Sequence, residues 1–283
     1  MSGEAKGPKV RVAARVGGPA FAVGLSLITI GPVIWLFTVS VKTKSEYAAS
    51  PFGIPSTLRF DNYEFILSDS EFLRFAWNSL LVTSSSVFII LVLSTLAAYA
   101  LARLDFAGNR LLFVAYLFGE VIPIFLILLP LYVLLPKTGL GGTLLSLILA
   151  YTAASLGISI LVLRSYFRSI PTEIEDAARI DGCNTILVIW HVMMPLIRPG
   201  IVVVAVFNIF NLWNEYLLAA FLLPSQKLFT LPPGLAASFV AQYATNWPAM
   251  AAGTTLFLLP VLVFTILLRK HLLRGITFGA VRK

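Results

Sequence analysis

Six long runs of apolar residues, none containing Lys or Arg, constrain the fold of this chain more than any other feature of its sequence. The hydrocarbon core of a bilayer is about 30 Å thick, and a helix needs roughly 20 apolar residues to cross it. Because lipid offers no partner to backbone polar groups, and the runs are too long for barrel strands, they predict helices. The predicted membrane spans are residues 18–41, 76–102, 111–135, 143–163, 200–223 and 248–268.

The composition supports a membrane protein over a water-soluble one. Hydrophobic residues make up 58% of the chain and charged residues 12%, whereas soluble domains average about 45–50% and about 25%. The predicted fold class is therefore an all-α integral membrane protein, a single domain over residues 1–283 with six transmembrane helices.

The net charge of +8 raises the question of a nucleic-acid partner, and the distribution of the charges answers it. An even number of spans places both termini on one side of the membrane. The termini and the loops on their side carry fifteen Lys and Arg residues, against six on the other side. By the positive-inside rule, both termini are predicted to be cytoplasmic, in a multi-pass protein of the cell membrane. The basic excess then needs no nucleic acid.

The sequence offers little for catalysis or for a metal site. It has one cysteine, Cys183, and two widely separated histidines, His191 and His271. An intramembrane enzyme using a buried glutamate would need a companion group, yet no H-E-x-x-H or G-x-S-x-G motif occurs. We therefore predict neither catalytic residues nor a metal.

The longest predicted cytoplasmic loop, residues 164–199, has the pattern of a compact structure. Thr172 and Glu175 stand at capping-box spacing, and Gly182 is well placed to end a short helix. A second apolar run follows and is expected to end at Pro195 and Pro199, before the fifth span begins. Two such helices suit insertion into a groove on another protein. The alternative, a helix lying on lipid headgroups, is disfavoured by the acidic residues of the loop.

Several polar residues lie inside predicted spans, where they are costly unless they face protein or water. Such residues line a transport path or hold helices together, and the sequence leaves both possibilities open. In the third span, Pro123 and Pro130 are also expected to interrupt the helical hydrogen bonding. The polar residues, with one adjacent tryptophan, are Glu120, Asn208, Asn211, Trp213, Asn214 and Glu215.

The loop also carries a recognisable motif. Residues 175–182, followed after nine residues by Val192-Met193-Met194-Pro195, resemble the EAA loop of ABC-importer permeases. Asp176, Val192 and Met194 depart from the motif, each conservatively. Four further segments are similar to the second permease of maltose-type carbohydrate importers: 98–103, 130–132 with 139–140 after it, 213–216 and 274–281.

This resemblance implies a type-1 permease fold with a core over residues 73–268 and a coupling loop over 164–199. It implies three protein partners: an ABC ATPase dimer, a second permease subunit, and an extracytoplasmic solute-binding protein facing loops 42–75 and 224–247. The substrate would be a sugar. The ATPase-coupling residues would be Thr172, Glu175, Asp176, Ala177, Ala178, Asp181, Gly182 and Pro195.

No G-x-x-x-x-G-K-[ST] phosphate loop occurs in the sequence, so ATP and Mg²⁺ are expected on the partner ATPase and no cofactor on this chain. The tail, 269–283, resembles one that reaches the ATPase interface. Two alternatives stay open. A secondary transporter would use Glu120 and Glu215 to carry protons, and an ABC permease could move an amino acid or phosphate.

Overall fold

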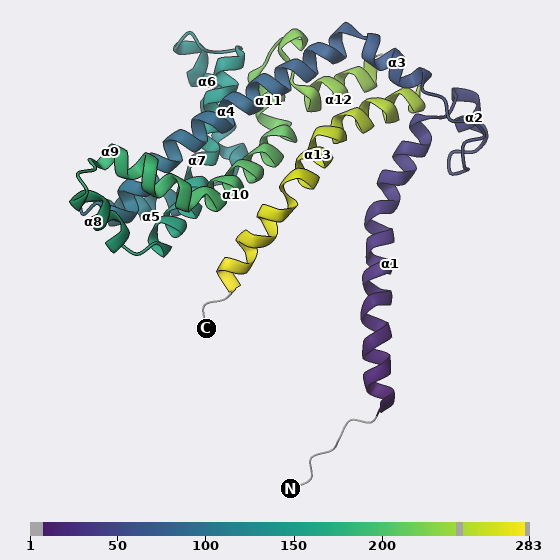
Figure 1. Cartoon of the computed structure of the whole chain (residues 1–283). Coiled ribbons are helices and arrows are strands. Elements are labelled where there is room, and N and C mark those ends of the chain that lie inside the picture. The colour runs from purple at the N-terminus through teal and green to yellow at the C-terminus, as the bar shows by residue number, and fades with distance from the viewer. Residues whose placement is uncertain (1–7, 242–245, 281–283) are drawn as a thin grey trace. The chain divides into compact units, whose positions relative to one another are not determined.

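The computed structural model describes residues 8–241 and 246–280, and every regular element in these ranges is helical (Figure 1). A π-helical turn (Val188–Met193) and a 3₁₀ turn (Gln226–Leu228) accompany the α-helices. The α-helices are α1 (Pro8–Ser40), α2 (Lys44–Ala49), α3 (Asp61–Ser68), α4 (Ser70–Arg103), α5 (Asn109–Gly119), α6 (Ile124–Lys137), α7 (Leu144–Ser169), α8 (Glu173–Ile180), α9 (Thr185–Leu187), α10 (Met194–Trp213), α11 (Leu217–Leu222), α12 (Leu231–Ala241) and α13 (Trp247–Ala280).

The chain forms two compact units where the sequence predicts one domain. The first unit comprises Met1–Asp69 and Ser238–Leu256, and the second Ser70–Ala237 and Phe257–Lys283. The first unit has polar contacts of its own that join separate segments of the chain. For example, the Asn62 side chain donates to the carbonyls of Ser40 and Lys42.

The first unit contains an ordered segment held by a buried lysine. The Lys42 side chain is only 1% exposed, and its ammonium donates to the carbonyl oxygens of Ser50 at 2.9 Å and Gly53 at 2.5 Å. The indole N–H of Trp35 donates to the carbonyl of Pro51 at 3.2 Å. Since a buried ammonium is costly without partners, these carbonyls fix the course of residues 50–53.

Glu46 ties a later part of this segment to α2. The backbone N–H of Ser56 donates to the Glu46 carboxylate at 2.6 Å, and this bond lowers the pKa of Glu46 below its ordinary value. The Thr43 hydroxyl caps α2 by accepting from the Glu46 N–H at 3.1 Å. Residues 42–56 are thus held in place largely by polar contacts with the backbone.

The second unit is built on the closely packed, parallel pair α4 and α7, with α10 packed on both (Figure 1). Tyr151 and Ile90 belong to one buried apolar cluster, and Tyr99 and Phe167 to another, at the end of the pair that carries α8. Small polar residues allow close approach between the two helices. The buried Ser86 hydroxyl of α4, for instance, donates to the Ile148 carbonyl of α7 at 3.4 Å.

The third predicted span, 111–135, is two helices instead of one. α5 ends at Gly119, α6 begins at Ile124, and their axes differ by 99°. Pro123 is the N-cap of α6 and has no N–H with which to continue α5, so the break follows from its chemistry. Pro130, in contrast, lies inside α6.

The helix that corresponds to the fifth predicted span, 200–223, both begins and ends earlier than predicted. Residues Thr185–Trp213 form one apolar helical stretch of 29 residues, so the prediction that a separate short helix ends at Pro195 is wrong. The π turn explains the continuity. In this turn, the Met194 N–H donates to the Ile189 carbonyl, five residues back. This wider hydrogen-bonding pattern accommodates the proline that follows.

By length and composition, four helical stretches of the described residues could each cross a membrane, or five if α5 and α6 together form one span. Residues 18–41 fall on α1, where Gly24–Ser40 is a shorter apolar helix. Loop 224–247 contains α12, which the sequence did not predict. The four stretches are Ser70–Arg103, Leu144–Ser169, Thr185–Trp213 and Trp247–Ile266.

Candidate functional site

The candidate site is α8, the short helix of the predicted coupling loop. It ends as expected at Gly182, whose φ of +89° is in the left-handed region. The Cys183 N–H donates to the Ala178 carbonyl at 3.0 Å and the Gly182 N–H to the Arg179 carbonyl at 3.1 Å. This pair of bonds is a Schellman motif, which gives the helix a defined end.

The start of α8 differs from the prediction. Thr172 is the N-cap, but its side chain makes no capping hydrogen bond, so the expected capping box with Glu175 does not form. Only the Thr172 carbonyl takes part, accepting from the N–H groups of Glu175 and Asp176. Thr172 itself has helical backbone angles (φ −67°, ψ −27°) and not the extended angles of a capping residue, and the Glu175 carboxylate is engaged by other partners.

Glu175 anchors α8 to the C-terminal end of α4. Its Oε1 accepts a hydrogen bond from the Arg103 Nε, and its Oε2 accepts one from the Tyr99 hydroxyl at 3.1 Å. The guanidinium also donates to the Ile170 carbonyl at 2.7 Å. The Arg103 and Glu175 side chains are 9% and 6% exposed. Because buried charges are stable only when paired and hydrogen-bonded, this arrangement fixes the position of α8.

The two alanines of the motif lie in different surroundings. Ala178 is buried in the apolar cluster below α8, whereas Ala177 is exposed. Ile174, Ala177 and Ile180 follow one another at helical spacing, and Ile180 is 87% exposed. Asp176 and Asp181 are exposed beside them. We call these five residues the outer face of α8.

Exposed apolar side chains continue beyond α8. Ile186 is 66% exposed and Trp190, in the π turn, 51%. Pro195 is also exposed, in the first turn of α10. A large apolar surface on a rigidly anchored element is typical of a protein-binding site.

The polar residues of the fifth span have different surroundings in the structure. Asn208 is completely buried and donates to the Ser159 hydroxyl of α7 at 3.0 Å. Asn211 and Asn214 are exposed, and Asn214 donates to the Phe210 carbonyl at 2.7 Å. The sequence left open whether such residues line a transport path or hold helices together. Asn208 joins α10 to α7 in this structure.

Glu215 lies at the break between α10 and α11. Its Oε2 accepts from the Tyr151 hydroxyl of α7 at 2.8 Å. The same carboxylate accepts from the backbone N–H groups of Leu218 at 2.8 Å and Ala219 at 3.2 Å. A carboxylate at the beginning of a helix satisfies donors that have no partner within that helix. Glu215 thus supports the interruption of the span and connects it to α7.

Trp213 is a packing residue in this structure. It is 6% exposed, its indole N–H donates to the Phe257 carbonyl at 3.1 Å, and the two rings stack with centroids 6.2 Å apart. Glu120 occupies the C-cap of α5, is exposed, and lies directly over Gly157 of α7. A Cβ at Gly157 would require the Glu120 carboxylate to move aside.

Sequence reasoning assigned no individual role to Tyr99, Arg103 or Tyr151. Tyr99 and Arg103 are four residues apart on α4, so they share a helix face. A polar pair at that spacing, at the end of an apolar span, is a signal that could have identified them. No comparable local signal marks Tyr151, because its partner is 64 residues away. In the described ranges, no group of three or more His, Cys, Asp or Glu residues could hold a metal ion.

Comparison with known proteins identifies the family. Residues 90–277 match the model of the binding-protein-dependent transport system inner membrane component, a region that includes α8 and both breaks described above. The chain belongs to this family.

Two relatives of this inner membrane component match it over nearly its whole length. The diacetylchitobiose uptake system permease protein NgcG of Streptomyces coelicolor is 34% identical over 258 residues, covering 91% of this chain and 85% of the relative. The trehalose transport system permease protein SugB of Mycobacterium tuberculosis is 34% identical over 262 residues, covering 92% and 94%.

A solved structure shows the same fold. A chain of a bacterial ABC transporter involved in the import of alginate superposes with a TM-score of 0.83 at 22% identity, covering 95% of this permease and 99% of that chain. The fold class predicted from the sequence, an all-helical type-1 permease, is therefore confirmed.

Proposed function

We propose that this permease is one membrane subunit of an ATP-driven importer that moves a sugar into the cytoplasm. Relatives at 34% identity are named for diacetylchitobiose and trehalose transport, which supports a di- or oligosaccharide or a related glycoside as substrate. The complete importer would contain a second permease, an ATPase dimer and an extracytoplasmic solute-binding protein.

The anchoring of α8 through Glu175 is the observation that carries this proposal. Its inner side is bound to Arg103 and Tyr99 of α4, while its outer face is exposed. A partner ATPase that bound the outer face and closed around ATP would move α8, and the ion pair would pass the displacement to α4 and α7. Movement of rigid packed helices is an established way to change a transport path between two open states.

ATP and Mg²⁺ would be bound by the ATPase partner, since this sequence has no phosphate-binding loop. For an almost complete change from an inward-open to an outward-open state, nucleotide must favour one state by about 5.5 kcal/mol. We infer that this chain contributes no chemistry and only transmits the motion.

Within the path, Asn211 and Asn214 are the strongest candidates for sugar contact because their side chains are exposed. Amide groups suit sugar hydroxyls, since they both donate and accept hydrogen bonds. Glu120 is a further candidate at the break between α5 and α6. Asn208, Trp213 and Glu215 would act by positioning the helices that carry the path.

The decisive experiment is ATP-dependent import with Ala177→Glu. This change places a bulky charge on the outer face of α8 without touching the anchor, so we expect loss of import and of crosslinking to the ATPase. The matched control is Ala107→Glu, an exposed position in the loop after α4, which should import like the wild type.

Sugars and non-sugars should be compared in the same assay. Import of a di- or oligosaccharide, with no import of amino acids or phosphate, is the expected result. Undiminished import by Ala177→Glu would contradict coupling through α8. Accumulation driven by a proton gradient without ATP would instead support a secondary transporter.

A further inference from the structure

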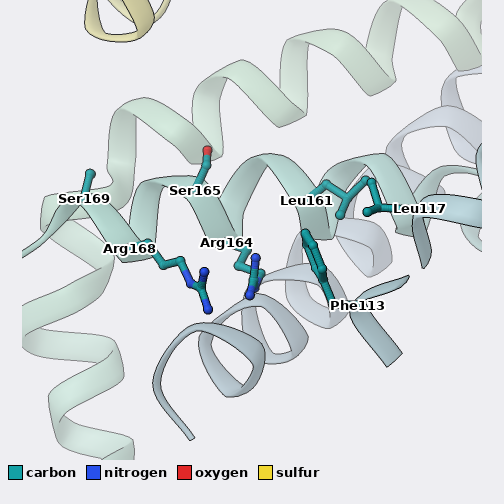
Figure 2. Close-up of a pocket in the computed structure, with 7 residues that line it drawn as sticks. All are labelled: Phe113, Leu117, Leu161, Arg164, Ser165, Arg168 and Ser169. Carbon is teal, nitrogen blue, oxygen red and sulfur yellow. The ribbon is translucent and has the colours of Figure 1, made fainter. Parts of the chain in front are cut away.

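A shallow cavity of about 360 Å³ lies between α5 and the C-terminal end of α7 (Figure 2). Two arginines of α7, Arg164 and Arg168, border it. Their guanidinium groups are neighbours and extend from the same side of the helix. Like charges at i and i+4 repel each other, so this arrangement needs an explanation.

Arg164 is held firmly in place. Its Nε donates to the Leu101 carbonyl of α4 at 3.2 Å, and its guanidinium carbon lies 3.8 Å from the centre of the Phe113 ring of α5. The cation–π contact and the hydrogen bond fix the plane of the guanidinium. Its terminal N–H groups are therefore oriented before any ligand binds.

The positive charge of the cavity is not neutralised by a carboxylate in its lining. Among the described residues, the arginines in ion pairs are Arg59, Arg74 and Arg103, and no acidic residue lines the cavity. The hydroxyls of Ser165 and Ser169 donate to carbonyls of their own helix. The donors left for a ligand are those of the two guanidinium groups, which bind phosphate oxygens well.

The other half of the cavity is apolar. Phe113 and Leu117 of α5 and Leu161 of α7 line it, and Leu117 is 43% exposed. Leu161 and Arg168 are seven residues apart, or about 10 Å along the helix. The cavity thus combines a cationic end with an apolar wall, as a headgroup and the start of its acyl chains require.

We propose that this cavity, the Arg164–Arg168 pocket, binds the phosphodiester of an anionic glycerophospholipid. A free inorganic anion would make no use of the apolar wall. Basic pockets between membrane helices on the cytoplasmic side bind anionic headgroups in this way. Placement in the inner leaflet rests on the proposed orientation, but lipid binding itself does not depend on transport.

Native mass spectrometry of the full-length protein, purified in a neutral detergent with any subunits that accompany it, tests the proposal. Phosphatidylglycerol and phosphatidylcholine are titrated in parallel. We expect preferential retention of phosphatidylglycerol, with the affinity reduced about fivefold in Arg168→Gln and about fivefold in Arg164→Gln. Arg168→Gln is the cleaner variant because no hydrogen bond or ion pair of Arg168 is seen in the described part of the chain.

Arg198→Gln is the matched control, since Arg198 is also exposed and on the same predicted side of the membrane. It should retain phosphatidylglycerol like the wild type. Equal retention of the two lipids, or an unchanged affinity in Arg168→Gln, would overturn the proposal. Displacement of the lipid by millimolar inorganic phosphate would identify a small-anion site. Crosslinking of Arg168→Cys to another subunit, with no lipid retained, would identify a protein interface.

Discussion

At the scale of single residues, Glu175 shows how one side chain can take a role that its motif does not reveal. The family motif places it in a loop that contacts another protein, yet its carboxylate points inward, to Arg103 and Tyr99. Its neighbours Ala177 and Ile180 are exposed, and we propose that they make the contact with a partner.

Replacing Glu175 tests this inward role. Glu175→Ala leaves the buried Arg103 guanidinium without its counter-charge, and such a loss typically costs about 3–5 kcal/mol. We expect a clearly lower unfolding temperature and faster proteolysis within residues 170–185. Asp176→Asn is the control, because Asp176 is exposed, and it should unfold like the wild type.

A second substitution distinguishes charge pairing from packing. If the ion pair matters mainly because a lone buried charge is costly, Arg103→Met combined with Glu175→Leu should recover much of the lost stability. Failure of the double variant to improve on Glu175→Ala would contradict this account.

At the scale of elements, α8 has a defined length because its last turn is closed by backbone hydrogen bonds. Gly182 supplies the left-handed conformation, and a methyl group there would meet nothing within 4 Å. The cost of a side chain at this position is therefore conformational and not steric.

Gly182→Ala should destabilise the end of α8 by about 1–2 kcal/mol, the cost of the left-handed region for a residue with Cβ. Gly182→Asn should cost less, because asparagine tolerates this region better than alanine. Thermal unfolding of both variants checks the order. Equal stability of Gly182→Ala and the wild type would show that the turn is not closed in this way.

The interruption after α10 is another element-scale feature. Glu215 satisfies the N–H groups of Leu218 and Ala219 at the beginning of α11, where these buried donors have no partner within their own helix. A hydrogen bond to a charged group contributes about 1.5–3 kcal/mol.

In Glu215→Gln, we expect the amides of Leu218 and Ala219 to exchange roughly ten- to a hundredfold faster with deuterium. Asn214→Ala, at the neighbouring exposed position, should leave their exchange unchanged. Unchanged exchange in Glu215→Gln would mean that α11 begins independently of the carboxylate.

At the scale of the whole molecule, the distribution of basic residues predicts the orientation in the membrane. Fifteen of the 21 Lys and Arg residues lie in the termini and in alternate loops. The prediction is therefore that α8 is cytoplasmic and that α2 is extracytoplasmic.

Cysteine labelling checks the orientation. The single native thiol, Cys183, is first removed as Cys183→Ser. Ser45→Cys in α2 should then react with an impermeant maleimide in intact cells, and Asn184→Cys only after the membrane is opened. The reverse pattern would overturn the orientation and, with it, the access of a cytoplasmic ATPase to α8.

The sequence predicted much of the candidate site, and the missing part has a physical explanation. Gly182 as the end of α8 follows from local preference, because only a few residues decide a turn. The inward direction of Glu175 depends on Arg103, which is 72 residues earlier in the chain. The capping box at Thr172 fails for a local reason, since Thr172 has helical backbone angles and not the extended angles of a capping residue.

The sequence by itself determined that this chain is a helical membrane protein with a short helix suited to a partner, because hydrophobic length and local turn preferences are properties of neighbouring residues. Only the tertiary structure decided which polar residues face inward, such as Asn208 toward Ser159 and Glu215 toward Tyr151. It also decided that the helix continues through Pro195. These outcomes depend on which helices pack together, since a buried polar group takes the partner that packing brings to it.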